Sequence, residues 1–255
     1  MPKVLIVTND FPPRAGGIQS FIHALATRLP AGGVVVYAPA WAGAAEFDQR
    51  QPFPVLRHPT SLMLPVPSVR ARAVRALTEH GCDRVLFGAA APLGLLAPAL
   101  RAAGAKRIVA VTHGHEAGWA ALPGARMLLR RIGDSVDVVT YLGEYFRARL
   151  ARALSPAAVA RMARLAPGVD TTEFRPGAGG AAIRDELGLG GRPVVVCVSR
   201  LVRRKGQDTL LRAWPAVRAR GGDPALLLVG SGPADGRLRR LASQLGVADS
   251  VLFTG

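Results

Sequence analysis

The 255-residue sequence lacks the features that mark secreted and membrane-spanning proteins. It has only two cysteines, Cys82 and Cys197, which lie in apolar contexts and are expected to be reduced packing residues. No apolar run reaches the ~20 residues that a membrane span requires. The amino terminus enters a predicted strand without the pattern of a signal peptide. We therefore expect a cytoplasmic protein.

Acidic and aromatic residues are also scarce. The chain has 17 acidic against 33 basic residues, a formal net charge of +16, and only 5% of its residues are aromatic. Such a charge favours nucleic acid, anionic lipid headgroups or phosphorylated substrates as partners, although an arginine-rich solvated surface would give the same count. Because stacking aromatics and recognised nucleic-acid motifs are missing, no nucleic-acid partner is expected.

Short apolar runs alternate with longer helical patterns over the first 170 residues. Strands are predicted at "KVLIV", "VVVYAP", "DRVLFGA", "RIVAVTHG" and "DVVTYL", and their continuous apolar character is typical of a parallel sheet that is covered on both faces. Helical patterns cover Gly17–Leu29, Pro92–Ala103, Arg126–Ile132 and Glu144–Ala153. The alternation predicts a Rossmann-like, doubly wound α/β domain.

A second domain is predicted after a break in this rhythm. Glycine, proline and threonine cluster over Ala166–Gly180, as at a linker. We divide the chain into a first domain, 1–170, a linker and entry segment, 171–192, and a second Rossmann-like parallel-sheet domain, 193–255. The second domain shows three strands and stops directly after one, which predicts an open sheet edge and a truncated domain.

The stretch "TNDFPPRAGGIQSF" follows the first predicted strand and carries two adjacent glycines, Gly16 and Gly17, where a helix begins. In an open parallel sheet, ligands bind beyond the carboxyl ends of the strands, where helix N-termini present unpaired N–H groups. Without a Cβ, these glycines would let a phosphate or sugar lie against the main chain. A plain strand–helix turn is the alternative, and the dinucleotide fingerprint G-x-G-x-x-G is absent.

The stretch "VTHGHEAGW" follows another predicted strand and brings together His113, His115 and Glu116. Histidine and carboxylate are zinc-ligand types, but the sequence offers no distant third ligand, so we expect no metal site. A histidine that contacts a substrate hydroxyl is favoured over a purely structural one.

The basic turn "SRLVRRKGQDTL" follows a strand of the second domain and places Arg200 and Lys205 across a strand–helix connection. A guanidinium, an ammonium and a helix N-terminus together suit a diphosphate. Lys205 is one of only three lysines in this arginine-rich chain, and a solvated basic turn is the alternative. With glycine-rich or cationic loops in both domains, we expect a nucleotide diphosphate linked to another group in a cleft between them.

In order along the chain, "TNDFPPRAGGIQSF", "THGHE", "APGVDTTEF" and "SRLVRRKGQD" resemble the GT-B glycosyltransferases of family 4, and among them the actinobacterial enzymes that mannosylate phosphatidylinositol mannosides. The resemblance covers essentially the whole chain. It implies that His113 is the catalytic residue near the transferred sugar. Donor contacts would be made by Gly16, Gly17, Arg200 and Lys205, with the two cations on the leaving diphosphate. Candidate acceptor or secondary contacts are Asp10, Gln19, His115 and Glu116.

The resemblance further implies retaining transfer of mannose from GDP-mannose to a lipid-linked inositol mannoside, without a metal or cofactor. Cations that act on the developing charge of the leaving group would lower the barrier. The paired glutamates and most of the nucleobase pocket of the family would lie beyond residue 255, so we expect the chain alone to turn over little. Two alternatives stay open: a family 4 enzyme that uses a UDP-sugar and a non-lipid acceptor, and a non-catalytic polyanion-binding module.

The segment Ser61–Leu77 gives an independent reason to expect a lipid partner. Met63 and its apolar neighbours at 64 and 66 precede arginines at 70, 72 and 75. Apolar residues beside a basic helix suit peripheral docking on an anionic bilayer, here the inner face of the plasma membrane. The apolar repeat at 69, 73 and 77 predicts an ordinary core-packed helix equally well.

Overall fold

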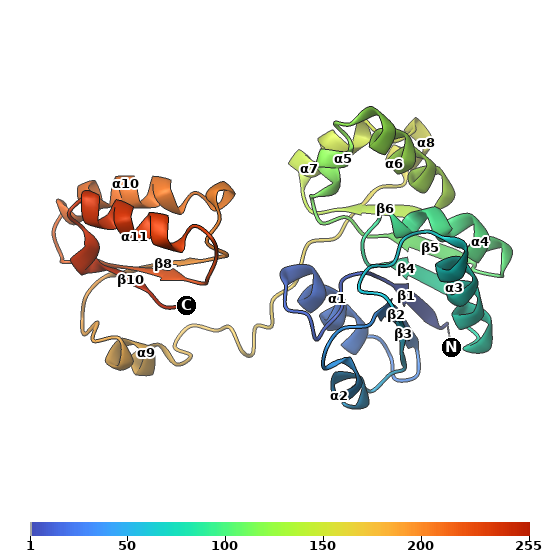
Figure 1. The fold of residues 1–255 in the computed structure, drawn as a ribbon, viewed down its shortest axis with the longest axis horizontal. Helices are drawn as coiled ribbons and strands as arrows, with labels where there is room; N and C mark the ends of the chain where they lie inside the picture. Colours follow the sequence, from blue (N-terminus) through green and yellow to red (C-terminus); the bar gives the residue numbers. More distant parts are fainter. Residues whose placement is uncertain (1) are drawn as a thin grey trace. The chain divides into compact units, whose positions relative to one another are not determined.

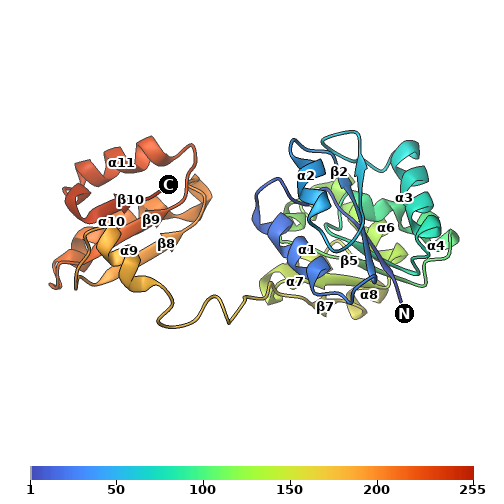
Figure 2. The same ribbon diagram turned by 90° about the horizontal axis from the view of Figure 1, so that it is seen from below.

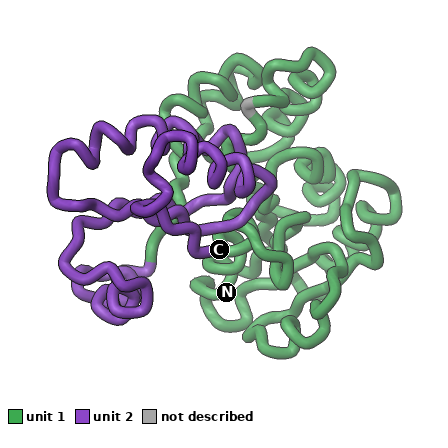
Figure 3. The backbone as a smooth tube through the Cα atoms, turned by 60° about the vertical axis from the view of Figure 1, so that its left-hand side comes forward, with its two compact units in different colours: residues 1–169 green, residues 170–255 purple. Residues whose placement is uncertain are grey.

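The computed structural model describes residues 2–255 and divides the chain into two compact units. Unit 1 is Met1–Val169 and unit 2 is Asp170–Gly255, each drawn in its own colour in Figure 3. Residues 171–192, separated as a linker in the sequence analysis, contain the helix α9 (Gly180–Glu186). Each unit contains its own parallel sheet.

Unit 1 is built on a seven-stranded parallel sheet with the order β3-β2-β1-β4-β5-β6-β7. Nearly every residue of β1 and β2 is buried, because helices cover both faces of the sheet. Successive strands extend the sheet to either side of β1, so the carboxyl ends of β1 and β4 flank the point where open α/β sheets bind ligands. The strands are β1 (Val4–Val7), β2 (Val34–Pro39), β3 (Val55–His58), β4 (Arg84–Phe87), β5 (Arg107–Ala110), β6 (Val138–Tyr141) and β7 (Ala163–Arg164).

Helices cover both faces of the unit 1 sheet (Figure 2). One layer contains α1 (Gly17–Thr27) and α2 (Ala44–Gln49), whose apolar residues pack with those of β1 and β2. The other layer buries a larger apolar cluster beneath the remaining helices. These are α3 (Pro67–Glu79), α4 (Ala97–Ala102), α6 (Pro123–Ser135), α7 (Glu144–Ala151) and α8 (Pro156–Ala160), with the short α5 (Glu116–Trp119) beside α7. Figure 2 shows α1 and α2 on one side of the sheet and α3, α4 and α6 on the other.

The five strands predicted for this unit are confirmed, and α2, β3, β7 and α8 were not predicted. The segment before α3 differs from one expectation. Met63 is fully buried. Its backbone is held by Asn9, whose side-chain Nδ2 donates to the Met63 carbonyl oxygen at 2.9 Å and whose Oδ1 accepts the Met63 N–H at 2.7 Å. The prediction that Met63 faces a bilayer is therefore wrong, whereas Leu62 and Leu64 remain exposed.

Unit 2 has a three-stranded parallel sheet with the order β10-β9-β8, as the three apolar runs predicted. The strands are β8 (Val194–Val198), β9 (Ala225–Val229) and β10 (Val251–Phe253). Figure 1 shows α10 (Gln207–Arg218) and α11 (Asp235–Gln244) over one face and α9 at the other. Both β10 and β8 are edge strands of this sheet. The exposed apolar side chains lie on β8, where Val196 and Val198 are 54% and 74% exposed.

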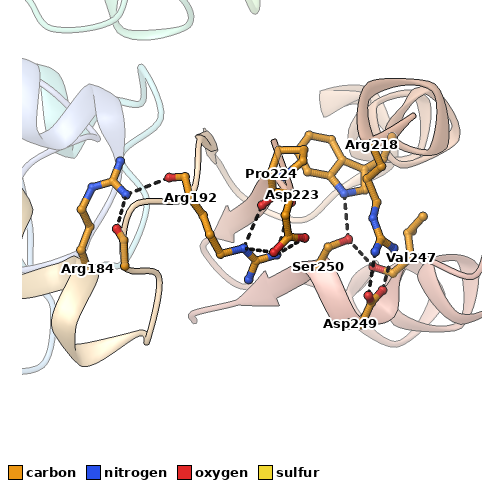
Figure 4. A network of polar contacts seen from close by, with 10 residues as sticks. Arg184, Arg192, Arg218, Asp223, Pro224, Val247, Asp249 and Ser250 are labelled. Atoms are coloured by element: carbon orange, nitrogen blue, oxygen red, sulfur yellow. Dashed lines mark hydrogen bonds and ion pairs between the residues drawn. The ribbon is translucent and has the colours of Figure 1, made fainter. Parts of the chain in front are cut away.

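Polar contacts fix the periphery of unit 2 (Figure 4). The Arg192 guanidinium binds Asp223 through both a carboxylate and the backbone carbonyl. Arg218 makes two hydrogen bonds of 2.8 Å with Asp249. The buried Trp214 indole donates to the Ser250 hydroxyl at 3.0 Å, so α10 is tied to the turn that leads into β10.

Two compositional features can be compared with the structure. Cys82 is buried, Cys197 is partly buried and both are free thiols, and burial raises the pKa of Cys82. None of the helices in the described part of the chain combines the length and apolar character needed to cross a bilayer.

Candidate functional site

Three strand ends meet at the carboxyl edge of the unit 1 sheet. Gly88, directly after β4, lies against Thr8, directly after β1: a Cβ at Gly88 would stand 2.5 Å from the Thr8 hydroxyl oxygen. The carbonyl oxygen of Gly88 lies 2.6 Å from Nε2 of His113, which follows β5. Sequence reasoning gave Gly88 no role, and its presence in "FGA" after a strand was the only available signal.

The contact with Gly88 orients the ring of His113. A carbonyl oxygen only accepts hydrogen bonds, so Nε2 carries the hydrogen. In the neutral ring Nδ1 is then the acceptor, and within residues 2–255 it has no hydrogen-bond partner. The half-buried ring packs edge-on against Phe21 of α1, with centroids 5.7 Å apart. The first turns of α1 and the His113 loop are therefore neighbours.

Glu116 holds the backbone of this loop from inside. Its side chain is fully buried, and one carboxylate oxygen accepts the His113 N–H at 3.0 Å. The other oxygen has no hydrogen bond among the described residues and lies 3.4 Å from Nε2 of His115. Because it is fully buried, Glu116 positions the loop rather than lying open to an acceptor. His115 is half-exposed and stacks on His113 with centroids 6.3 Å apart.

The glycine of "THGHE" is required by the fold itself. Gly114 has φ of 90°, a conformation that side chains rarely adopt. A Cβ there would also meet the Phe146 ring of α7 at 2.7 Å. The turn between His113 and His115 is thus fixed by local sterics as well as by Glu116.

The two glycines at the start of α1 have different surroundings. A Cβ at Gly16 would collide with the side-chain oxygen of Gln19, which is itself only 6% exposed. The Gln19 amide donates to the Asp10 carboxylate at 2.8 Å, so Gly16 is needed to keep this pair in place. At Gly17, by contrast, no protein atom lies within 4 Å of a Cβ position. Nothing in the fold of unit 1 excludes a side chain at Gly17.

In unit 2, a buried glutamine organises the predicted cationic loop. Gln207, the first residue of α10, is 2% exposed. Its amide donates to the Ser199 hydroxyl at 2.8 Å and to the Arg200 carbonyl at 3.0 Å. The backbone after β8 is thereby fixed to the start of α10. The sequence alone gives this residue no role, because a buried polar clamp has no sequence signature.

The cations of this loop are exposed and have no acidic partner. Arg200 and Lys205 make no ion pair with any described carboxylate, whereas other arginines of unit 2, such as Arg218, are paired with aspartates. The nearest acid in sequence, Asp208, is 3.5 Å from Arg237 instead. Uncompensated cations beside the N-terminus of α10 suit an anionic ligand.

The structure thus joins the predicted residues within each unit. In unit 1 it brings together the Asp10–Gln19 pair, the start of α1 and the His113 loop; in unit 2 it fixes Arg200 at the start of α10. No cluster of three or more His, Cys, Asp or Glu side chains among the described residues is placed to hold a metal ion.

Comparisons with known proteins assign both units. The model of Glycosyltransferase Family 4 matches residues 15–173, and the model of Glycosyl transferases group 1 matches residues 181–255. The chain is 54% identical, over 98% of its length and 66% of the relative's, to the "GDP-mannose-dependent alpha-(1-6)-phosphatidylinositol monomannoside mannosyltransferase" of Mycolicibacterium smegmatis. It is 53% identical to the Mycobacterium tuberculosis H37Rv protein of the same name, over its full length and 68% of that relative.

The solved structures confirm the predicted fold class. Anabaena Alr3699/HepE in complex with UDP superposes with a TM-score of 0.76 at 18% identity, over 99% of this chain and 69% of that one. This likeness shows the GT-B fold. The chain spans about two thirds of the length of the curated relatives that it matches.

Proposed function

Because the chain belongs to glycosyltransferase family 4, we propose that it carries most of a retaining mannosyltransferase that transfers mannose from GDP-mannose to a phosphatidylinositol mannoside. The observation that carries this proposal is the 53–54% identity, over essentially the whole chain, to two proteins named for that reaction. The matched length covers 98–100% of the chain and so spans both units.

The cationic loop of unit 2 is proposed to bind the diphosphate of the donor. Arg200 and Lys205 have no acidic partner among the described residues, and the Gln207 clamp fixes the backbone that carries Arg200. As the sugar–phosphate bond breaks, negative charge accumulates on the diphosphate. Cations that are already in place stabilise this charge more strongly in the transition state than in the ground state.

The carboxyl edge of unit 1 is proposed to hold the sugar and the acceptor. The open position at Gly17 lets a ligand approach the main chain at the start of α1. The free Nδ1 of His113 accepts a hydrogen bond from a hydroxyl of the transferred sugar. Asp10, oriented by the buried Gln19, is the proposed acceptor contact.

Transfer with these groups needs neither a metal nor a cofactor. Positive charge develops on the sugar and negative charge on the diphosphate, which Arg200 and Lys205 stabilise. The leaving phosphate then receives the proton of the incoming hydroxyl on the same face, so configuration is retained and no protein base is required. Transfer that persists at full rate in EDTA is the expected result.

A lipid acceptor places the enzyme at a membrane surface. Leu62 and Leu64 are 56% and 48% exposed just before the arginine-rich helix α3, which suits peripheral contact with an anionic bilayer. The opposite face of α3 is packed in the core through its apolar repeat. We propose a cytoplasmic protein that binds the inner face of the plasma membrane peripherally.

The test uses the chain alone and the chain joined at its carboxyl end to the last third of the M. smegmatis relative (the extended chain). With GDP-mannose and phosphatidylinositol monomannoside, the extended chain is expected to form the dimannoside, and the chain alone to form little. UDP-glucose is expected to give no product.

Two outcomes would replace the proposal. Transfer from a UDP-sugar to a water-soluble acceptor by the extended chain would indicate a different family 4 reaction. Binding of any polyanion without preference for a sugar nucleotide, and without transfer, would indicate a non-catalytic module.

A further inference from the structure

The helix α6 carries a second, solvent-facing stripe besides its core face. Leu129, Ile132 and Gly133 are buried. The second stripe consists of residues at the spacing i, i+3, i+4, i+7, which places them on one side of the helix: Pro123, Arg126, Met127 and Arg130. This stripe has no part in the core or in the site described above.

The stripe forms one wall of a cavity of about 260 Å³. The other wall is Arg152, Ala153 and Leu154, from the connection between α7 and α8; α8 packs against α6 and lies beside it in Figure 1. Three arginines, Arg126, Arg130 and Arg152, therefore line one cavity, and no acidic residue lines it.

None of these three guanidiniums has an ion pair or hydrogen bond with a described residue. Two other arginines of unit 1 show the contrast: Arg57 binds the Asp48 carboxylate at 2.7 Å, and Arg101 binds the Asp137 carboxylate at 2.7 Å. Like charges that converge without a counter-charge repel one another. An anion that accepts hydrogen bonds from several guanidiniums would remove this repulsion, and a phosphate group suits that geometry.

The surroundings of the cavity favour a lipid phosphate over a soluble one. Leu122, which precedes α6, and Met127 beside the arginines are 62% and 53% exposed. A soluble phosphate would make no use of exposed apolar side chains, whereas a bilayer accepts them below its headgroups. We propose that Arg126, Arg130 and Arg152 bind the phosphate of an anionic phospholipid headgroup, with Leu122 and Met127 in the apolar boundary of the bilayer. The choice of a lipid phosphate rests on the proposed function.

Vesicle binding in the absence of any sugar nucleotide measures this site separately from mannosyl transfer. The 255-residue chain is floated with vesicles of phosphatidylcholine alone and of phosphatidylcholine with phosphatidylinositol. Binding is expected only to the second. Arg126→Gln and Arg130→Gln are each expected to weaken it about fivefold, the effect of one basic residue near an anionic surface.

Arg84→Gln is the matched control. Like the cavity arginines, Arg84 is exposed and without an ion pair, but it lies at the amino end of β4, at the edge of the sheet opposite the carboxyl edge. It is expected to change binding less than twofold, as a distant charge is screened. Met127→Ser is expected to weaken vesicle binding while leaving the thermal unfolding midpoint unchanged, because this side chain is exposed.

Three results would overturn the inference. The first is an equal loss of binding in Arg84→Gln and Arg130→Gln, which would mean attraction by net charge alone. The second is vesicle binding that none of the α6 substitutions weakens. The third is binding of inorganic phosphate that depends on Arg126 and Arg130 while vesicles bind independently of them, which would identify a soluble ligand. Loss of mannosyl transfer with vesicle binding intact would instead count only against the proposed function.

Discussion

Nε2 of His113 lies 2.6 Å from the carbonyl oxygen of Gly88, so the orientation of this ring is set by the backbone that follows a neighbouring strand. The hydrogen on Nε2 is committed to that bond, and Nδ1 stays available to a ligand. A hydrogen bond between two different strand ends thus turns a histidine in a loop into a fixed acceptor at the sheet edge.

His113→Ala is expected to lower kcat/KM of the extended chain for mannosyl transfer by about ten- to hundredfold, the effect of losing one positioned hydrogen bond to the substrate. His115→Ala is the matched control, since His115 is half-exposed, stacks on the His113 ring and makes no hydrogen bond with Gly88. Its effect is expected to stay within about twofold. The reverse ranking would make His115 the sugar contact.

Glu116 is expected to act on the loop rather than on the substrate. Glu116→Ala leaves the His113 N–H buried without an acceptor, which costs about 1–3 kcal/mol of unfolding free energy. Glu116→Gln keeps an oxygen that accepts this bond and is expected to retain most of the stability. Urea unfolding of both variants provides the measurement, and equal destabilisation would contradict the assigned hydrogen bond.

The two glycines before α1 are expected to respond differently to alanine. Gly16→Ala displaces the Gln19 amide and is expected to destabilise the fold, with about 1–3 kcal/mol lost as for other overpacked sites. Gly17→Ala meets no protein atom, so stability is retained, but the added methyl group lies where the donor is proposed to approach. It is expected to raise the KM for GDP-mannose. An unchanged KM would remove Gly17 from the donor site.

The stability of unit 1 is expected to depend on pH through the buried pair Tyr37 and His58. The Tyr37 hydroxyl lies 2.7 Å from Nδ1 of His58. Burial, with Arg72 as a second cause, lowers the pKa of His58 below its usual 6.5. The folded state therefore binds this proton less well than the unfolded state, and the free energy of unfolding falls as the pH drops below 6.5.

The same pair also makes stability depend on pH in the alkaline range, because burial disfavours the charged form of Tyr37 as it does that of His58. Burial raises the pKa of Tyr37 from 10.0 to about 12. The unfolded state loses this proton first, so stability is expected to fall as the pH rises from 10 to about 12. Urea unfolding across the pH range measures both effects. Tyr37→Phe should abolish the alkaline loss, and an unchanged alkaline slope would contradict the assignment.

The sequence predicts the strands of both sheets because buried parallel strands are continuously apolar, as in "VVVYAP". It also predicts that Gly17, His113 and Arg200 lie at carboxyl edges, because each lies in the connection that follows such a run. Contacts between residues distant in sequence were beyond this reasoning. Asn9 binds the backbone of Met63 across 54 positions and turns an apparent bilayer contact into a core residue.

The supporting roles of two polar residues could not be predicted for the same reason. Gln207 and Glu116 each begin a helix, and only the folded chain shows that both are buried and bound to the backbone of a neighbouring functional residue. In the sequence, both look like exposed polar residues at a helix start. Burial depends on how α10 and the His113 loop close over them, which local sequence does not specify.

Lys205 provides the most direct test, because the account depends on cations that stabilise a departing diphosphate. In the extended chain, Lys205→Gln is expected to lower kcat for mannosyl transfer from GDP-mannose about 10²- to 10³-fold, the usual effect of removing one transition-state charge contact. Arg220→Gln, which removes the same charge beyond the end of α10, should change kcat less than about twofold. Equal kcat values for Lys205→Gln and Arg220→Gln would contradict the account.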